Sequence, residues 1–418
     1  MNELFNSAVK YISEIVKFDS SQKPAECGAP FGKETAECLE YFLKLAASFG
    51  FETKNYDNYA GEVIFGEGEE FAILAHLDVV PAGSGWTHEP FGGEIDYDNR
   101  KIWGRGTMDD KGPAVCALLA LKTLKDTGFK PKKKIKLIVG CNEENGWACI
   151  DYYNAHAHMP ETGFSPDADF PVIYAEKGIL HLKLKFGADK NFTALKGGER
   201  GNMVCDLCEV TAQADGGRLK KYNLTSENGK IVSRGKSAHG STPELGVNAI
   251  APILLYLGLD KMHALLFEDG FGIQSFEDET GRLTFSPNVI EQTADGIFVT
   301  CDVRYPATFD KAQILSAIES RGVSYEILHY QAPLYNDKNC ELIKTLCGVY
   351  NEVTGKHMQP VAIGGGTYAR ALKCGAAFGP EEEGEEQTIH KPDEYITFTK
   401  IERCLEIYRL AVERLTRK

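Results

Sequence analysis

The stretch "FAILAHLDVV" (residues 71–80) decides the fold, because a buried strand in it ends on polar side chains. The run opens with consecutive apolar residues, which indicates a strand covered on both faces. A segment with helical character (residues 113–128) and a second apolar strand, "KKIKLIVGC" (residues 133–141), follow it. This strand–helix–strand order predicts an α/β fold with a mainly parallel sheet flanked by helices on both faces.

Local signals place further elements around this unit. The helix over residues 113–128 has Pro113 in its first turn and ends on Gly128. A hairpin is predicted around residues 95–104, with its turn at Asp98 and Asn99. Apolar periodicity also predicts helices over residues 2–18 and 34–49 and, after a helical pattern that returns near residue 336, over the C-terminal residues 401–418.

The sequence changes character near residue 180, where short strands of alternating polarity replace the long apolar ones. They cover residues 179–186, 205–213, 230–240 and 296–306, with helices near residues 246–258 and 309–321. This pattern is typical of a layered α+β domain. We therefore expect a catalytic α/β domain at residues 1–179 and 333–418. An inserted α+β lid domain, which would bind substrate or mediate dimerisation, would occupy residues 180–332.

Composition excludes several classes of function. The 418 residues are 43% apolar and 25% charged, as in a globular protein, and the net charge of −14 without a basic stripe argues against nucleic-acid binding. No window approaches the roughly 18 apolar residues of a membrane span, and acids in the N-terminal segment argue against a secretory signal. The twelve cysteines are scattered, which favours free thiols and a cytoplasmic location.

Three local features have ordinary structural explanations. Cys205 and Cys208 form a C-x-x-C without a second pair at zinc-site spacing, so a strand is favoured over a metal or redox site. The acidic run "PEEEGEEQ" (residues 380–387) is expected to be a solvated loop. Lys111 is expected to face solvent.

Four short segments place metal-type ligands where predicted strands end. They hold His76 and Asp78, Asp109 and Asp110, Glu143 and Glu144, and Asp167. Any one of them has a simpler explanation, as a structural histidine or a solvated turn. Loops at the carboxyl ends of parallel strands converge, however, and so many carboxylates repel one another unless a cation compensates them. The four segments together therefore predict a divalent-metal site with two ions.

The motifs "HLDVVPAGSGW", "GRGTMDDKG", "NEEN" and "SPDA" resemble those of the co-catalytic di-zinc metallopeptidase family. This family includes aminoacylase, carnosinase, carboxypeptidase G and desuccinylase. The resemblance is strongest to bacterial PepV-type dipeptidases, through "GFKPKKKIKLIVGCNEE" and through "IDYY" ahead of "FSPDADFPVI". It implies a zinc-aminopeptidase-like sheet interrupted by a lid.

The resemblance also implies a ligand set. His76 and Asp167 would bind one ion, Glu144 and His390 would bind the other, and Asp109 would bridge both. Mixed histidine and carboxylate ligation suits zinc, with manganese and cobalt as alternatives.

Three further features near the ligands follow from the resemblance. Glu143, beside a ligand but not one itself, would be the general base that takes a proton from the attacking water and passes it to the leaving amine. Asp78 would accept a hydrogen bond from the far imidazole nitrogen of His76. The peptide bond between Asp109 and Asp110 would be cis, and Asp110 would not be a ligand.

Substrate-binding residues are expected in two places. In the inserted domain, His239 would stabilise the oxyanion or a substrate carboxylate, together with Asn202 and Arg304. The alternatives for these two are a turn asparagine and a surface arginine. The run "AIGGGTYAR" (residues 362–370) lacks the Lys-Ser/Thr of a phosphate loop and is interpreted as an anion nest for a substrate carboxylate. Its members would be Gly365, Gly366, Thr367 and Arg370.

The predicted function is hydrolysis of the amide bond of dipeptides. An N-acyl amino-acid deacylase of the same family is the alternative, since it would use the same metal chemistry on a different pocket. A peptide-binding protein without catalysis has no need of an unligated carboxylate such as Glu143. A monomer and a homodimer both remain open, and His239 would act within its own chain or in a partner.

Overall fold

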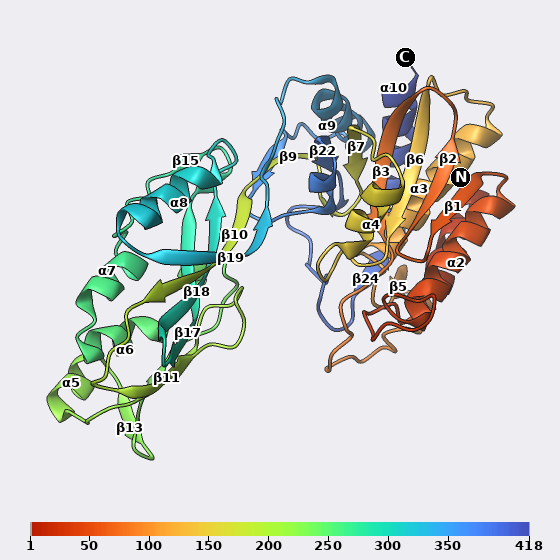
Figure 1. Ribbon diagram of the computed structural model, residues 1–418. Coiled ribbons are helices and arrows are strands. Elements are labelled where there is room, and N and C mark those ends of the chain that lie inside the picture. The colour runs from red at the N-terminus through yellow and green to blue at the C-terminus, as the bar shows by residue number, and fades with distance from the viewer. Residues whose placement is uncertain (1, 418) are drawn as a thin grey trace. The chain divides into compact units, whose positions relative to one another are not determined.

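The computed structural model describes residues 2–417, and the chain divides into two compact units (Figure 1). The first unit is formed by residues 2–174, Asn336–Val361 and residues 367–417. The second is formed by Ala175–Tyr335 and Ala362–Gly366. Among the described residues, none of the helices combines the length and the apolar character that crossing a membrane requires.

Parallel strands form the centre of the sheet in the first unit. β3 (Glu69–His76) lies between β6 (Lys133–Gly140) and β7 (Thr162–Ser165), and it is parallel to both. β22 (Cys374–Ala377) continues the parallel order beyond β7. The carboxyl ends of these strands therefore meet at one edge of the sheet, where the register sets His76 opposite Gly140.

The margins of this sheet are antiparallel, so the predicted mainly parallel order holds only for its centre. β1 (Glu52–Tyr56) and β2 (Ala60–Phe65) form a hairpin, and β2 pairs antiparallel with β6. A connection as short as residues 57–59 can join only antiparallel strands. On the other side β9 (Ile173–Glu176) pairs antiparallel with β22 through its first residue.

Helices cover both faces of the sheet, as the sequence predicted. Gly61 and Glu62 are successive residues of β2 and therefore point to opposite faces. Side chains of α2 (Lys33–Ser48) pack over Gly61. On the other face Tyr153 of α4 (Ala148–His156) donates its hydroxyl to the Glu62 carboxylate at 2.7 Å.

The predicted helix after Gly112 is α3 (Lys111–Asp126), and it is almost entirely buried. It packs against β3, α1 (Asn2–Val16) and α10 (Phe398–Thr416). The expectation that Lys111 faces solvent was wrong. Because the first turn of α3 has no exposed side, Lys111 is fully buried, and its Nζ donates to the Phe18 carbonyl at 2.7 Å.

Two segments of the first unit connect the C-terminal part of the chain to the site. β4 (Glu94–Asp96) and β5 (Lys101–Trp103) form the predicted hairpin, and β24 (Tyr395–Thr397) pairs with β5. α9 (Glu341–Thr354) packs against α10.

The acidic run at residues 380–387 is largely exposed, as predicted. Glu382 is the exception: it is buried, and its carboxylate accepts a hydrogen bond from Arg403 at 2.7 Å.

The second unit is an antiparallel sheet with helices, the α+β texture that the sequence predicted. The strand order is β13 (Thr225–Glu227), β14 (Lys230–Arg234), β12 (Leu207–Thr211), β11 (Thr193–Gly197), β17 (Thr284–Thr293), β18 (Gly296–Tyr305), β10 (Gly178–Phe186) and β19 (Ser324–Gln331). Buried residues of α6 (Ile250–Leu257), α7 (Asp260–Phe267) and α8 (Lys311–Ser320) belong to the same apolar core as the buried residues of β10. Alternate residues of β10 face this core, which is the expected period of two.

The carboxyl end of β6 allows a sharp test of packing at the site edge. A Cβ atom added at Gly140 would lie 1.9 Å from the hydroxyl oxygen of Tyr368. We expect Gly140→Ala to lower the free energy of unfolding by about 1–3 kcal/mol through overpacking. In that background Tyr368→Phe should recover part of the loss, so urea unfolding of the double-mutant cycle should show coupling.

The control for this experiment is Gly348→Ala in α9, where an added Cβ meets no atom within 4 Å. It should be neutral or stabilise the helix by up to about 1 kcal/mol. Strict additivity of Gly140→Ala and Tyr368→Phe would contradict the packing argument.

Candidate metal centre

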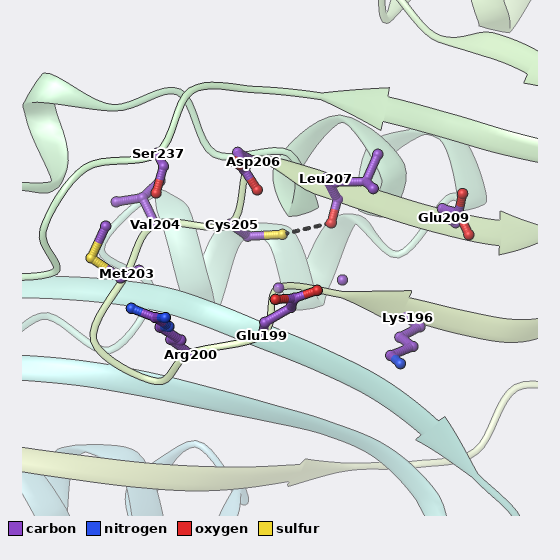
Figure 2. Close-up of a pocket in the computed structure, with 12 residues that line it drawn as sticks. Lys196, Glu199, Arg200, Met203, Val204, Cys205, Asp206, Leu207, Glu209 and Ser237 are labelled. Carbon is purple, nitrogen blue, oxygen red and sulfur yellow. Dashed lines mark hydrogen bonds between the residues drawn. The ribbon is translucent and has the colours of Figure 1, made fainter. Parts of the chain in front are cut away.

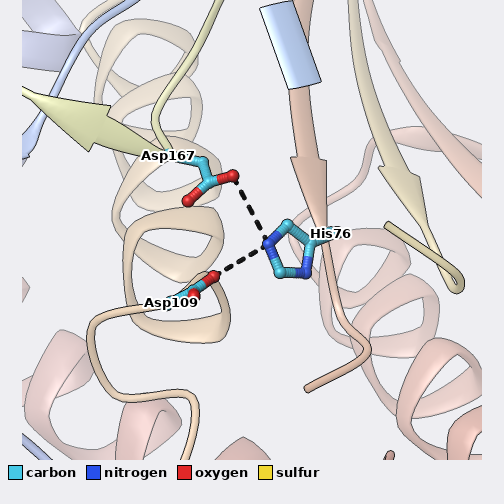
Figure 3. Close-up of side chains that lie close together, drawn as sticks. All are labelled: His76, Asp109 and Asp167. Carbon is cyan, nitrogen blue, oxygen red and sulfur yellow. Dashed lines mark ion pairs between the residues drawn. The ribbon is translucent and has the colours of Figure 1, made fainter. Parts of the chain in front are cut away.

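The strand ends bring the first group of predicted ligands together. His76 is the last residue of β3, Asp167 lies just beyond β7, and Asp109 lies in the loop before α3. The His76 Nε2 atom is 2.9 Å from Asp109 Oδ1 and 3.6 Å from Asp167 Oδ2. Figure 3 shows both carboxylates converging on this one nitrogen of the ring. The arrangement follows from the parallel register of β3 and β7.

A second group forms on the other oxygen of Asp109. His390 Nε2 is 2.8 Å from Asp109 Oδ2 and 3.1 Å from Glu144 Oε1. Asp109 therefore belongs to both groups, and in each group the ligand atoms lie within 4.8 Å of one another. The structure thus collects all five residues that the sequence proposed as ligands, one of them from a segment far along the chain.

The donor atoms in these groups fit divalent cations. They are imidazole nitrogens and carboxylate oxygens, the ligands that zinc and similar ions take in catalytic sites. His76 Nε2 is buried and makes no hydrogen bond of acceptable geometry with the described residues, although Asp109 Oδ1 is 2.9 Å away. A buried ring nitrogen left in this way among carboxylate oxygens fits the position of a metal ligand.

Asp78 supports the site differently from the prediction. The acceptor nearest to His76 Nδ1 is the backbone carbonyl of Asp78 at 3.0 Å, while its carboxylate oxygen is 3.6 Å away. That carboxylate instead accepts the backbone N–H groups of Glu143 and Glu144, each at 3.0 Å. Asp78 lies two residues beyond the end of β3, where its side chain reaches the amides of the loop after β6.

Glu143 lies beside the ligand Glu144 but belongs to neither ligand group. Its Oε1 accepts the indole N–H of Trp147 at 3.1 Å. Burial raises the pKa of Glu143 well above its usual value, and the negative charges of Asp167 and Glu144 add to this. Sequence reasoning missed Trp147. The only signal was its position four residues after Glu143 in "NEENGW".

Asp110 has a role distinct from that of Asp109. The peptide bond between them is cis, as predicted. Asp110 is fully buried, and its Oδ2 accepts the backbone N–H of His76 at 3.1 Å. It belongs to neither of the two ligand groups found among the described residues. Burial raises its pKa well above the usual range.

The charges of the two groups are strongly coupled. Burial would lower the pKa of His390, but the Asp109 and Glu144 carboxylates outweigh it and raise this pKa to about 11. Burial would also lower the pKa of His76, but the carboxylates of Asp109 and Asp167 outweigh it and raise this pKa well above its usual value. Conversely, although burial opposes it, the two imidazoles hold the pKa of Asp109 well below its usual value. Burial and the charge of Asp109 raise the pKa of Glu144 to about 7.

The predicted substrate residues of the second unit lie near one another. The Asn202 carbonyl accepts the N–H of Gly240, the neighbour of His239, at 2.7 Å. Arg304 is 6% exposed, and its guanidinium donates two hydrogen bonds to the Asp302 carboxylate, at 2.7 and 3.0 Å. The alternative that Arg304 is a surface arginine is therefore wrong. Burial lowers the pKa of His239, and the positive charge of Arg304 acts in the same direction.

The predicted anion nest is divided between the two units. Residues 362–366, with Gly365 and Gly366, belong to the second unit, and Thr367 and Arg370 belong to the first. Thr367 Oγ1 accepts the N–H of Ala369 at 3.3 Å and so caps a short helical turn. Binding of a carboxylate by this segment stays a prediction.

A cavity of about 560 Å³ lies in the second unit and is lined mainly by the end of β11, the start of β12 and the loop that joins them (Figure 2). Lys196, Arg200 and Cys205 are among the residues that line it, and no residue of the two metal groups does. The Cys205 thiol donates to the Leu207 carbonyl at 3.1 Å. Cys208 lies in β12, whereas Cys205 precedes that strand, so the strand predicted for the C-x-x-C segment includes only its second cysteine.

Comparison with known proteins agrees with this geometry. The Beta-Ala-Xaa dipeptidase of Lactobacillus delbrueckii subsp. lactis is 34% identical to the chain, covering 99% of this chain and 96% of that protein. The putative dipeptidase YtjP of Bacillus subtilis (strain 168) is also 34% identical, over 93% of this chain and 92% of its own.

Similarity at the level of the fold extends further. The structure of the dipeptidase Dug1p from Saccharomyces cerevisiae superposes with a TM-score of 0.62 at 13% identity, covering 100% of this chain and 97% of that chain. The profile of Peptidase family M20/M25/M40 matches residues 72–414, a span that contains all five proposed ligands. The chain therefore belongs to Peptidase family M20/M25/M40 and is a divalent-metal peptidase, which confirms the resemblance seen in its motifs.

Proposed function

We propose that the chain hydrolyses the amide bond of dipeptides with two bound zinc ions. His76 and Asp167 would hold one ion, Glu144 and His390 the other, and Asp109 both. The observation that carries the proposal is the placement of Asp109, whose two oxygens face two different histidines. A carboxylate in that position is suited to bridging two cations, and two cations offset the repulsion among the ligands.

The ions would polarise the amide carbonyl and make water a better nucleophile at neutral pH. Glu143 would take the proton of the attacking water and deliver it to the leaving amine. Its position supports this role, because it lies next to the ligand Glu144 and outside both ligand groups. Trp147 holds one oxygen of Glu143, and Asp78 holds its backbone, so the carboxylate is oriented before substrate binds.

The second unit, Ala175–Tyr335 with Ala362–Gly366, would serve as the inserted lid. The sequence predicted this lid at residues 180–332, between catalytic segments 1–179 and 333–418, and so left out residues 362–366. His239 and Asn202 would polarise the carbonyl, and Arg304 would hold a carboxylate. The ion pair with Asp302 supports this, because it fixes the orientation of the Arg304 guanidinium. The segment with Gly365, Gly366, Thr367 and Arg370 would bind the carboxylate of the substrate.

Dipeptides are favoured over N-acyl amino acids because relatives named as dipeptidases match nearly the whole chain. The two substrate classes share the amide chemistry and differ in the group at the N-terminal side of the bond. We expect the zinc-loaded enzyme to release free amino acids from a mixed panel of dipeptides. Mass spectrometry of the products would measure this release. Turnover of succinyl- or acetyl-amino acids alone would overturn the dipeptidase assignment in favour of the deacylase.

Two variants separate metal binding from proton transfer. Glu143→Ala should retain both ions and lose at least about 100-fold in kcat, the usual contribution of a general acid–base. Asp109→Ala should lose metal, because both groups share this carboxylate. The measurements are metal content by elemental analysis and kcat on one dipeptide. Near-normal activity of Glu143→Ala, or two ions retained by Asp109→Ala, would refute the respective role.

Metal binding should release protons. The pKa of His390, raised to about 11, keeps its ring protonated at pH 7 in the metal-free protein, and the pKa of His76 is shifted in the same direction. A ring nitrogen must lose its proton before it binds an ion. Apparent zinc affinity should therefore rise with pH between about 6 and 9. The stability of the metal-free protein should depend on pH in the opposite direction. The contribution of charged His390 to the free energy of unfolding is complete below the pKa that this group has in the unfolded chain, and it is lost as pH rises through about 11.

Calorimetric titration with zinc in buffers of different ionisation enthalpy measures the released protons directly. His390→Gln, titrated in parallel, should release fewer. A binding enthalpy that is independent of the buffer would contradict the protonated state of the His390 ring.

A further inference from the structure

Glu394 is a fully buried carboxylate next to the loop that carries Asp109, and neither the metal groups nor the proposed chemistry uses it. It directly precedes β24, and the pairing of β24 with β5 holds it against the start of that loop. Its backbone carbonyl accepts the N–H of Gly104 at 2.8 Å. The loop from Gly104 to Asp109 is thus anchored to the C-terminal segment before its side chains are considered.

The Glu394 side chain collects donors from this loop. Its Oε1 accepts the backbone N–H groups of Gly106 at 3.0 Å, Met108 at 2.9 Å and Asp109 at 3.4 Å. Its Oε2 accepts Nη1 of Arg105 at 2.6 Å, and Arg105 is itself 1% exposed. A carboxylate is needed here because it accepts at both oxygens, whereas a neutral amide would turn a donor toward the guanidinium.

These contacts reach both halves of the metal centre. Glu394 accepts a hydrogen bond from the backbone N–H of Asp109, and Asp109 is the residue that the two ligand groups share. Glu394 also lies four residues after His390, whose Nε2 is 2.8 Å from Asp109 Oδ2. A shift of Glu394 would therefore move the shared carboxylate and the segment carrying its second histidine together.

We propose that Glu394 is a positioning residue that sets the place of the Asp109 carboxylate and thereby the affinity for both metal ions. The inference rests on the proposed metal-dependent function and adds a residue that acts through Asp109 without touching metal or substrate. Partners of this kind change metal affinity by about 10–100-fold when they are replaced.

The test is metal binding by Glu394→Gln, titrated with zinc alone and with cobalt, whose absorption spectrum reports ligand geometry. The variant keeps the size of the side chain and one acceptor for the loop amides. We expect zinc affinity to fall about 10–100-fold and the cobalt spectrum to change. At saturating metal kcat should recover substantially with KM unchanged, because no substrate contact has been altered.

Glu382→Gln is the matched control. Glu382 is also a buried carboxylate of the first unit bonded to an arginine, Arg403, and it belongs to neither metal group. It should lower thermal stability while leaving zinc affinity and the cobalt spectrum unchanged. If Glu394→Gln behaves in the same way as this control, its role is structural and the inference is wrong.

Two outcomes separate this inference from the proposed function. Failure of the wild-type chain to bind zinc would sink the metal-dependent function itself, whereas normal zinc binding by both the wild type and Glu394→Gln would sink only the positioning role. If Glu394→Gln does not fold, Glu394→Asp serves instead. It keeps the charge but withdraws it by one methylene from the loop amides, and unchanged zinc affinity in that variant would also overturn the inference.

Discussion

Electrostatic repulsion among carboxylates is the constraint on which the first unit depends. Six acidic side chains gather around the two imidazoles at the carboxyl edge of the sheet. They are Asp78, Asp109, Asp110, Glu143, Glu144 and Asp167. Such a gathering is tolerated only if protons, hydrogen-bond donors or cations compensate it. In the protein alone the imidazoles of His76 and His390 lie against these carboxylates, and burial raises the pKa values of Asp110 and Glu143. Divalent metal ions would supply further positive charge at the same place.

The structure resolves the repulsion by giving acids two separate uses. One set faces the metal groups, with Asp109 shared between them. The other set accepts backbone N–H groups of the ligand-bearing segments: Asp78 holds the loop of Glu144, and Asp110 holds the strand end at His76. Glu394 would do the same for the loop of Asp109. Three of the five ligand residues, His76, Asp109 and Glu144, thus have their backbone N–H held by a carboxylate from another part of the chain.

Much of this could be predicted from residue types and their order. The apolar strands, the helix after Gly112 and the ligand-type residues at strand ends all follow from local patterns that the fold preserves. Lys111 was misjudged because a lysine in a first helical turn is ordinarily exposed, and only the packing of α1 and α10 around α3 buries it. Asp78 was placed near the right histidine, but its carboxylate faces the next loop.

The sequence by itself determined which elements form and which side chains are available as ligands, because strand and helix periodicity and metal preference are local properties. The resemblance of the motifs separated Asp109, a proposed ligand, from its neighbour Asp110. Only the tertiary structure decided which backbone amides Asp78 and Asp110 accept, because this depends on what lies opposite each side chain. Glu394 accepts a hydrogen bond from Arg105, which lies 289 positions away in the sequence, and no local pattern encodes a contact at such a distance.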